Sequence, residues 1–389
     1  MTNAVAILSL SAALISADGI RGQRLTVNEL HAGWIQLFDG ESLFGWQSSD
    51  AGDWNVHEGV LTAGTNKPSR LCTTSEFADY VLRFEFRASN AGKAQVILRS
   101  PPDSVDGTDY YAMNVGTAKP SEFPIGSFHN RAKSLAKEVL SGWQAYQVTA
   151  DSGHFVVTIN GEKVLDYTDQ NPTLRGFIAI TASQAGAEFR NIKLLPRNLK
   201  SLFNGRDLQG WRPFPGQQSK LTVTEAGELH LQNGRGQAET IDVYGDFALQ
   251  LQACLNGRNL NSGVFFRCIP GDMLNGYECQ LDNRFKDGDR TQPIDYGTGG
   301  IYRRQAARRV ISDDQLWFSL TVMAASKHMA AWVNGYQVSD WTDDREPNEN
   351  PRNGVRTAAG TIALQGHDQT TDLLFRDLRA KELPYSPSR

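Results

Sequence analysis

Two neighbouring runs in the second half of the chain gather side chains that could do chemistry. They lie within residues 261–283, which read NSGVFFRCIPGDMLNGYECQLDN. Alternate residues of a strand point to the same face. On that rule, one face of the first run carries Asn261, Gly263, Phe265 and Arg267. One face of the second run carries Glu278, Gln280 and Asp282. Such a line of arginine, amide and carboxylate groups is typical of either a solvated sheet face or a carbohydrate site.

The spacing of the two carboxylates restricts the chemistry of such a site. Glu278 and Asp282 are four residues apart, which places them about 13 Å apart along a strand. Retaining glycosidases need carboxyl groups ~5–5.5 Å apart and inverting glycosidases need them ~6.5–9.5 Å apart. Hydrolysis by this pair of carboxylates is therefore not expected unless another acid enters from a different strand.

A third run adds a glutamine and a histidine. In TIALQGH (361–367), alternation turns the aliphatic residues to the core and Gln365 and His367 to the opposite face. His367 is either a site residue or a plain surface histidine, and Gln365 follows the same choice.

Composition and charge exclude several classes of protein. The chain has 389 residues, 40% of them hydrophobic and 21% charged, which is typical of a globular protein of two or three domains. The formal net charge of −4 gives no basic surplus that would favour nucleic acid or anionic lipid as a partner. The four cysteines show no zinc-ligand spacing, and Cys268 and Cys279 are expected as buried thiols or as one disulfide.

The first residues resemble a leader segment. AVAILSLSAALISADG has the length of a signal-peptide apolar region, and residues 1–24 are expected to be removed on export to the periplasm or the extracellular space. The positively charged start of such a peptide is missing, so a short buried helix in a cytoplasmic protein is the alternative. No later segment predicts a transmembrane helix.

The chain contains two copies of one pattern. IQLFDGESLFGW (35–46) returns as KSLFNGRDLQGW (200–211), an offset of 165 residues. Further blocks return in the same order, namely AQVILRS (94–100) as SGVFFRC (262–268), INGEKV (159–164) as VNGYQV (333–338), GFIAITAS (176–183) as GTIALQGH (360–367) and FRNIKL (189–194) as FRDLRA (375–380). This order indicates tandem homologous domains, and the period is too long for a solenoid. We call residues 25–196 the first unit and residues 199–384 the second unit.

Each unit shows the pattern of short antiparallel strands. The runs are rich in β-branched and aromatic residues and are bounded by Gly, Asn, Asp and Pro. Asn160-Gly161 and Asn334-Gly335 predict two-residue hairpin turns, because both central positions of such a turn need φ > 0. A helix is expected only over residues 25–34. The pattern predicts an all-β fold with one two-sheet sandwich per unit.

The blocks of the second unit also carry a family resemblance. LFNGRDLQGW, NSGVFFRC, GYECQLDN, GGIYR and GTIALQGH resemble the 3-keto-disaccharide hydrolase domain, also described as a 3-keto-glucoside 1,2-lyase and 3-keto-2-hydroxy-glucal hydratase domain. The resemblance spans residues 200–382, whereas about 33–196 resemble the family in the framework blocks only. It implies two tandem concanavalin-A-like lectin/glucanase jelly-roll sandwiches, in agreement with the all-β pattern.

The first unit departs from the family where the second unit carries polar residues. In place of Glu278, Gln280, Asp282, Gln365 and His367 it has Ala112, Asn114, Gly116, Thr181 and Ser183. Arg267 keeps a counterpart, Arg99, and a structural ion pair is therefore the alternative role for Arg267. We expect any chemistry in the second unit, while the first unit binds sugar or only packs against its twin.

The resemblance implies elimination on a 3-keto-glycoside. The C3 carbonyl acidifies the C2–H bond, so one base, one oxyanion stabiliser and one acid suffice. It implies Glu278 or His367 as base or acid, and Arg267 or a divalent metal at the enolate oxygen, with no metal ligand set visible in the sequence. It further implies substrate-binding roles for Asn261, Gln280, Asp282, Tyr302 and Gln365.

Two other function classes stay open. One is a pair of non-catalytic carbohydrate-binding modules, in which replacement of Glu278 by glutamine would leave binding intact. The other is a conventional endo-glucanase, which would cleave polysaccharide with no need for a 3-keto group. A carbohydrate is the expected partner in every case.

Overall fold

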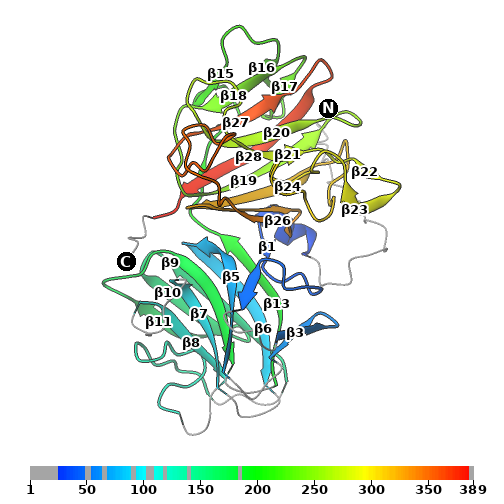
Figure 1. Cartoon of the computed structure of the whole chain (residues 1–389). Coiled ribbons are helices and arrows are strands. Elements are labelled where there is room, and N and C mark those ends of the chain that lie inside the picture. Colours follow the sequence, from blue (N-terminus) through cyan, green and yellow to red (C-terminus); the bar gives the residue numbers. More distant parts are fainter. Residues whose placement is uncertain are drawn as a thin grey trace, which may run out of the picture.

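The structure of the chain is a computed structural model that describes residues 25–48, 54–63, 68–88, 93–101, 109–116, 121–137, 142–182 and 186–384 (Figure 1). Within these ranges the chain forms 28 strands and one short helix. The expected leader, residues 1–24, lies outside the described residues.

The first unit is a sandwich of two antiparallel sheets. Its eight-stranded sheet runs in the order β11 (Glu162–Thr168), β10 (His154–Ile159), β9 (Gln144–Asp151), β6 (Tyr80–Ala88), β13 (Ala187–Pro196), β4 (Val60–Ala63) and β3 (Trp54–His57), with β1 (Ile35–Gln36) paired to β13. Its five-stranded sheet runs in the order β2 (Trp46–Ser48), β5 (Ser69–Phe77), β12 (Gly176–Ala182), β7 (Ala94–Ser100) and β8 (Tyr111–Gly116).

The second unit repeats this arrangement strand for strand. Its eight-stranded sheet runs in the order β16 (Lys220–Val223), β17 (Leu229–Gln232), β28 (Asp372–Glu382), β19 (Phe247–Leu255), β24 (Phe318–Ala325), β25 (His328–Val333) and β26 (Tyr336–Thr342), with β14 (Lys200–Ser201) paired to β28. Its five-stranded sheet runs in the order β15 (Trp211–Pro213), β18 (Gly236–Thr240), β27 (Thr361–Gly366), β20 (Ser262–Cys268) and β21 (Tyr277–Leu281). A small hairpin joins β22 (Phe285–Lys286) and β23 (Asp289–Pro293). The expectation of two tandem all-β sandwiches is therefore confirmed.

Local signals in the sequence explain the turns and the helix. Helix α1 (Val27–Ala32) begins after Thr26, which forms a capping box with Glu29, and it ends at Gly33 in the left-handed conformation. The two Asn-Gly turns have positive φ at both positions, 51° and 85° at residues 160–161 and 47° and 74° at residues 334–335. The helix and both hairpins are confirmed.

A β-bulge in β20 changes which residues face the core. Val264 and Phe266 lie in the core of the second unit, as alternation predicts. The register of β20 against β27 then shifts between Phe265 and Cys268, and Arg267 has a φ of 49°. The extra residue reverses the alternation, so Cys268 joins Phe265 on the outer face of the sheet. The four cysteines are free thiols.

The same bulge overturns the expected position of Arg267. Its guanidinium is fully buried and donates to the carbonyl oxygens of Gly245, Ser326 and Arg356 and to the Asp246 carboxylate. Arg99 in the first unit also sits in a bulge, with a φ of 54°, and bonds three carbonyl oxygens and Asp79. A five-donor guanidinium so occupied is a structural cross-link, not a group that faces substrate.

The two units share an apolar interface. The outer face of the second unit's eight-stranded sheet packs against the first unit, so that second-unit side chains join the first unit's core cluster, namely Ala248, Met323, Ala330 and Trp332. The segment that contains α1 and β1 lies between the units in Figure 1. The Trp332 indole donates to the Gln36 carbonyl oxygen at 2.9 Å across this boundary.

Reciprocal ion pairs reinforce this interface. Asp246, which holds Arg267, also accepts from Arg175 of the first unit at 2.8 Å. Asp79, which holds Arg99, also binds Lys381 of the second unit. Each bulge arginine is thus linked through one aspartate to a cation of the other unit.

Candidate active site

The outer face of the second unit's five-stranded sheet carries two rows of paired residues, each with polar side chains in it. Phe265 pairs with Glu278 on one side and with Ala363 on the other, and Ala363 pairs with Glu239. Beyond Glu278, the amide of Tyr302 donates to the Glu278 carbonyl oxygen at 2.9 Å. Because directly paired residues share a face, this gives a row of five residues, namely Glu239, Ala363, Phe265, Glu278 and Tyr302.

In the second row, Gly263 stands between the glutamines Gln280 and Gln365, and Gln237 follows Gln365. Gly263 pairs with Gln280, and Gln365 pairs with Gln237. Gly263 is also the neighbour of Gln365, because the adjacent residues Val264 and Leu364 are paired. The two glutamine side chains therefore stand on either side of a position that has no side chain.

The Glu278 side chain lies over Gly263. A Cβ atom added at Gly263 would stand 2.7 Å from Oε1 and 2.8 Å from Cγ of Glu278. Only glycine leaves this space free. In the first unit, Gln95 occupies the equivalent position and pairs with Asn114, while the position of Glu278 is Ala112. The glycine and the carboxylate thus occur together in one unit and are both missing in the other.

The protein environment places the pKa of Glu278 near neutrality. The residue is 7% exposed, and burial raises the pKa of its carboxyl from 4.5 to about 7. The Arg352 guanidinium, whose Nη2 lies 3.9 Å from Glu278 Oε2, lowers this pKa. The Asp295 charge raises the pKa further, and the Arg303 charge lowers it. A carboxyl group with such a pKa can both accept and donate a proton at neutral pH.

Two buried amide oxygens at this site lack a donor. Gln280 is 1% exposed and Gln365 is 8% exposed. The Oε1 atom of each finds no hydrogen-bond partner among the described residues. Buried acceptors of this kind are costly unless something donates to them. Hydroxyl groups of a bound sugar would supply such donors.

Asp295 is a second carboxylate at the site, and the sequence analysis missed it. Its Oδ2 accepts from Asn261 Nδ2 at 2.5 Å and from Gln280 Nε2 at 3.2 Å. Asp295 and Tyr296 both have positive φ, 47° and 71°, which is unusual for two consecutive non-glycine residues. The residue lies in the loop after β23, where no periodic pattern marks which way a side chain points.

Arg352 also comes from a loop that the sequence did not single out. The loop winds around Arg345, which donates to the carbonyl oxygens of Pro351, Arg352 and Gly354 and pairs with buried Asp343. Arg352 in turn donates to the Leu274 carbonyl oxygen and packs over Phe265, 5.4 Å from the ring centre. Its guanidinium is thereby held beside Glu278.

The structure brings only part of the predicted set together. Tyr302 lies beside Glu278, and Asn261 and Gln280 share Asp295. Asp282 is fully buried and pairs with Arg284, which accounts for its carboxylate.

His367 lies away from Glu278 on the same face. It is four residues beyond Ala363, which belongs to the Glu278 row, so the offset is about 13 Å along the strand. Its Nδ1 lies 2.8 Å from the Asp368 carboxylate, and its side chain is 41% exposed. Together with Arg267, His367 is thus separated from the cluster around Glu278.

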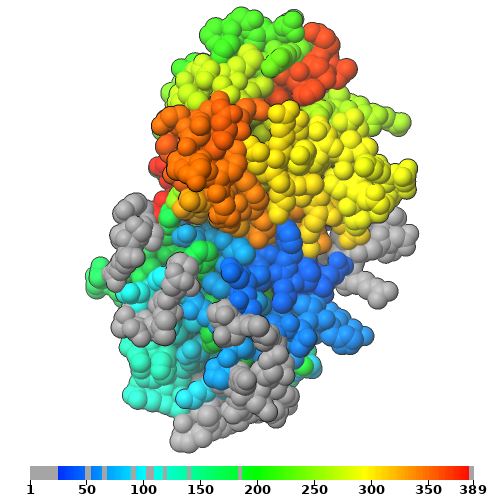
Figure 2. Space-filling model, in the orientation of Figure 1, coloured from blue at the N-terminus to red at the C-terminus, as the bar shows by residue number. Residues whose placement is uncertain are grey.

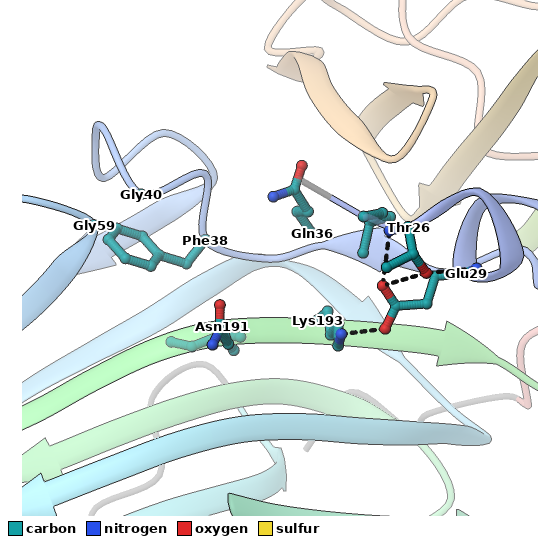
Figure 3. A pocket seen from close by; sticks show the side chains of 10 residues that line it. Thr26, Glu29, Gln36, Phe38, Gly40, Gly59, Asn191 and Lys193 are labelled. Atoms are coloured by element: carbon teal, nitrogen blue, oxygen red, sulfur yellow. Dashed lines mark hydrogen bonds and ion pairs between the residues drawn. The ribbon is translucent and has the colours of Figure 1, made fainter. Parts of the chain in front are cut away.

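A separate pocket of about 190 Å³ lies in the first unit (Figure 3). It is lined by α1, the segment around β1 and part of β13. Its charged groups satisfy one another, because Glu29 binds both Lys193 and Thr26.

No group of three or more His, Cys, Asp or Glu residues in the described ranges could hold a metal ion, and no helix there is long and apolar enough to cross a membrane.

Comparison with known proteins places both units in one family. A family model described as a 3-keto-alpha-glucoside-1,2-lyase-like domain matches residues 33–195 and again residues 198–381. No curated protein matches the chain.

Solved structures match the chain over a single unit's length. Two proteins from Parabacteroides distasonis assigned as glycosyl hydrolases match with 15% and 22% identity and TM-scores of 0.40 and 0.39, covering 45% and 48% of this chain and 98% and 100% of theirs. The carbohydrate-binding module CBM66 from Bacillus subtilis matches with 13% identity and a TM-score of 0.34, covering 48% of this chain and 100% of its own.

Proposed function

Because the chain belongs to the 3-keto-alpha-glucoside-1,2-lyase-like family in both of its units, we propose that the second unit cleaves 3-keto-glycosides by elimination across C1 and C2. The family supports a carbohydrate-active enzyme. The observation that carries the assignment of this activity to the second unit is Glu278, a buried carboxyl group with a pKa of about 7 between two orphan amide oxygens.

Glu278 is the base in this proposal. Its carboxylate takes the C2 proton, and the electron pair moves into an enolate whose charge rests on the C3 oxygen. The enolate then collapses, forming the C1–C2 double bond and breaking the bond from C1 to the leaving oxygen, which takes up a proton. Addition of water to the 3-keto-2-hydroxy-glucal completes a net hydrolysis. A base with a pKa near the working pH suits such a proton transfer.

The neighbours of Glu278 fit the remaining needs of this reaction. The developing enolate charge needs positive charge nearby, and Arg352 is the guanidinium closest to Glu278 in the described chain. The orphan oxygens of Gln280 and Gln365 can accept from sugar hydroxyls, and Tyr302 offers a ring and a phenol beside the base. Arg352 therefore takes the role that the sequence had suggested for Arg267.

The position of Asp295 supports a second candidate function, conventional glycoside hydrolysis by two carboxylates. The sequence excluded two-carboxylate hydrolysis unless another acid entered from a different segment, and Asp295 is such an acid. The Oδ2 atom of Asp295 already accepts hydrogen bonds from the amides of Asn261 and Gln280. Asp295 is therefore better suited to positioning these two side chains than to transferring a proton. A conventional glycosidase would nevertheless cleave an unoxidised glycoside.

The test compares a 3-keto-glucoside with the same unoxidised glucoside by NMR. We expect cleavage of the keto compound alone, with C2 deuterium exchange or a 2-hydroxy-glucal intermediate in D₂O. Glu278→Gln should abolish both signals, whereas Glu349→Gln, at an exposed glutamate on the Arg352 loop, should leave them unchanged.

The other outcomes are equally informative. Equal cleavage of both compounds would overturn the keto-sugar proposal in favour of the Glu278–Asp295 pair. If neither compound reacts but both bind, and Glu278→Gln still binds, the second unit is a carbohydrate-binding module.

A further inference from the structure

We propose that the natural substrate carries an anionic group, a carboxylate, sulfate or phosphate, which Arg303 binds at the mouth of the site. This inference rests on the proposed function, since it names the class of 3-keto-glycoside that the site accepts. It is carried by the position and the pairing of the arginines around Glu278.

Arg303 is an exposed cation held in place beside the base. It follows Tyr302, whose amide bonds the Glu278 carbonyl oxygen, and its guanidinium lies 5.3 Å from the centre of the Tyr302 ring. Its backbone is in the left-handed region, with a φ of 59°. No carboxylate lies within ion-pair distance of its guanidinium in the part of the chain that the structure describes.

Other arginines near the site do have such partners. Arg284 pairs with Asp282, Arg345 with Asp343 and Arg356 with Glu349. Arg267 is bound to Asp246 in the interior. The guanidiniums that face Glu278 differ, because Arg352 reaches only to 3.9 Å from Glu278 and Arg303 has no acidic partner at all in the described chain.

A third arginine ties these two together. Arg304 donates to the carbonyl oxygens of both Arg303 and Arg352, at 3.1 and 2.8 Å. The segments that carry them, coloured yellow and orange, meet on one face of the molecule in Figure 2. Burial, followed by the charge of Arg345, lowers the pKa of Arg304. The fold therefore brings cations together at a cost, in a protein whose net charge is −4.

The enolate alone does not account for Arg303. The enolate charge forms at the ring, next to buried Glu278, where Arg352 is the closer cation. The charge of an exposed guanidinium is screened by water and acts weakly at that depth. A negative group on the part of the substrate that projects towards solvent would meet Arg303 directly, and a guanidinium suits carboxylate, sulfate and phosphate geometry.

The test uses three substrates, namely phenyl 3-keto-glucoside, its 4-carboxyphenyl analogue and phenyl 3-keto-glucuronide. We expect at least one anionic compound to have a kcat/KM about twofold to fivefold above the neutral one, the worth of one exposed ion pair. Arg303→Ala should remove that advantage through KM, without changing kcat for the neutral compound at about pH 9, where Glu278 is ionised with or without the Arg303 charge. The two anionic compounds show whether the group belongs on the aglycone or on C6.

The control is Arg206→Ala, which removes another exposed charge of the second unit and should keep the preference, because Arg206 precedes β15, the edge strand at the other end of the sheet from β21. Equal kcat/KM for all three substrates would overturn the inference. So would a fall in kcat for the neutral compound in Arg303→Ala at about pH 9, because Glu278 is ionised in both proteins there and Arg303 would then act on the enolate.

Failure of the proposed function would look different. In that case no keto compound is turned over, and the anion preference is measured as equilibrium binding of the same compounds to Glu278→Gln and to its Arg303→Ala double variant. Equal binding of neutral and anionic compounds would then reject the inference on its own terms.

Discussion

At the scale of single residues, the site depends on how Glu278 is surrounded. Burial raises the pKa of this carboxyl to about 7, and the two charged neighbours with the largest effect act in opposite directions, Arg352 lowering it and Asp295 raising it. Since a base works only when ionised, the rate of C2 deprotonation should rise with pH through this pKa.

The pH profile is therefore expected to move in opposite directions in two variants. In wild type, kcat/KM for a 3-keto-glucoside should rise with an apparent pKa of about 7. Arg352→Met removes the largest influence that lowers the pKa of Glu278, so its rising limb should move to higher pH. Asp295→Asn removes the neighbouring negative charge that adds to the effect of burial on this pKa, so its limb should move to lower pH. Profiles that coincide in all three proteins would show that Glu278 is not the titrating base.

Alternation along two strands located part of the site from the sequence, whereas two charged residues on loops were missed. The alternation of β21 and β27 indicated that Glu278, Gln280 and Gln365 share a face, and the pairing of the strands confirms this. Asp295 and Arg352 come from irregular segments, in which contacts with distant backbone atoms determine the direction of the side chain. The sequence thus supplied the strand residues of the site together with Asn261 and Tyr302, but neither Asp295 nor Arg352.

At the scale of elements, strand β20 contributes to the site through what it lacks. Gly263 leaves room for the Glu278 carboxylate, and the bulge after Phe265 turns Arg267 inward to the interface. A bulge adds one residue to the strand, and nothing in the composition of the strand marks where it occurs. Alternation counted along the sequence therefore assigned Arg267 to the wrong face. By contrast, the Asn-Gly hairpins were predictable because the turn itself demands those residues.

Gly263→Ala should impair the reaction without unfolding the strand. The added Cβ would stand 2.7 Å from Glu278 Oε1, so the carboxylate must move. A displacement of about 1 Å from reacting atoms costs roughly 100-fold in rate. We expect kcat to fall by about that factor while the thermal midpoint and the circular dichroism spectrum stay close to wild type, because alanine is tolerated in a strand.

The matched control lies at the same position of the other unit. Gln95→Gly changes the equivalent residue of β7 and should leave kcat untouched. A Gly263→Ala protein with wild-type kcat would mean that the Glu278 carboxylate does not need its place above Gly263.

At the scale of the whole molecule, the two units are joined at more than the short link between them. Arg175 lies between Asp246, at 2.8 Å, and Glu76, at 3.1 Å, and its side chain is 9% exposed. Asp246 in turn holds the bulge arginine of the second unit. The interface is therefore continuous with the interior of the sandwich that carries the candidate site.

Arg175→Ala should destabilise the whole chain in one transition. Removing one partner from a buried charge cluster typically costs about 3 kcal/mol, equivalent to roughly 4 °C in the thermal midpoint of a protein this size. Lys163→Ala, which breaks an exposed pair with Asp166, is the control and should change the midpoint little. Two separate transitions in calorimetry of the wild type would show that the units unfold independently. Equal effects of both variants would show that the Arg175 cluster adds no more stability than the exposed pair.

The interface between the units gives a physical reason why a duplicated domain is retained after it has lost its own site. The first unit lacks the carboxylate and the glycine of the second, yet the second unit now presents Trp332 and Met323 as part of its twin's core. A deletion of the first copy would leave this apolar surface open to water and to aggregation. Selection can thus retain the first unit after the loss of its site, because this unit still covers the apolar surface of the second unit. Mutations that erase polar residues from the first unit are then tolerated, whereas mutations on the side facing the second unit are not.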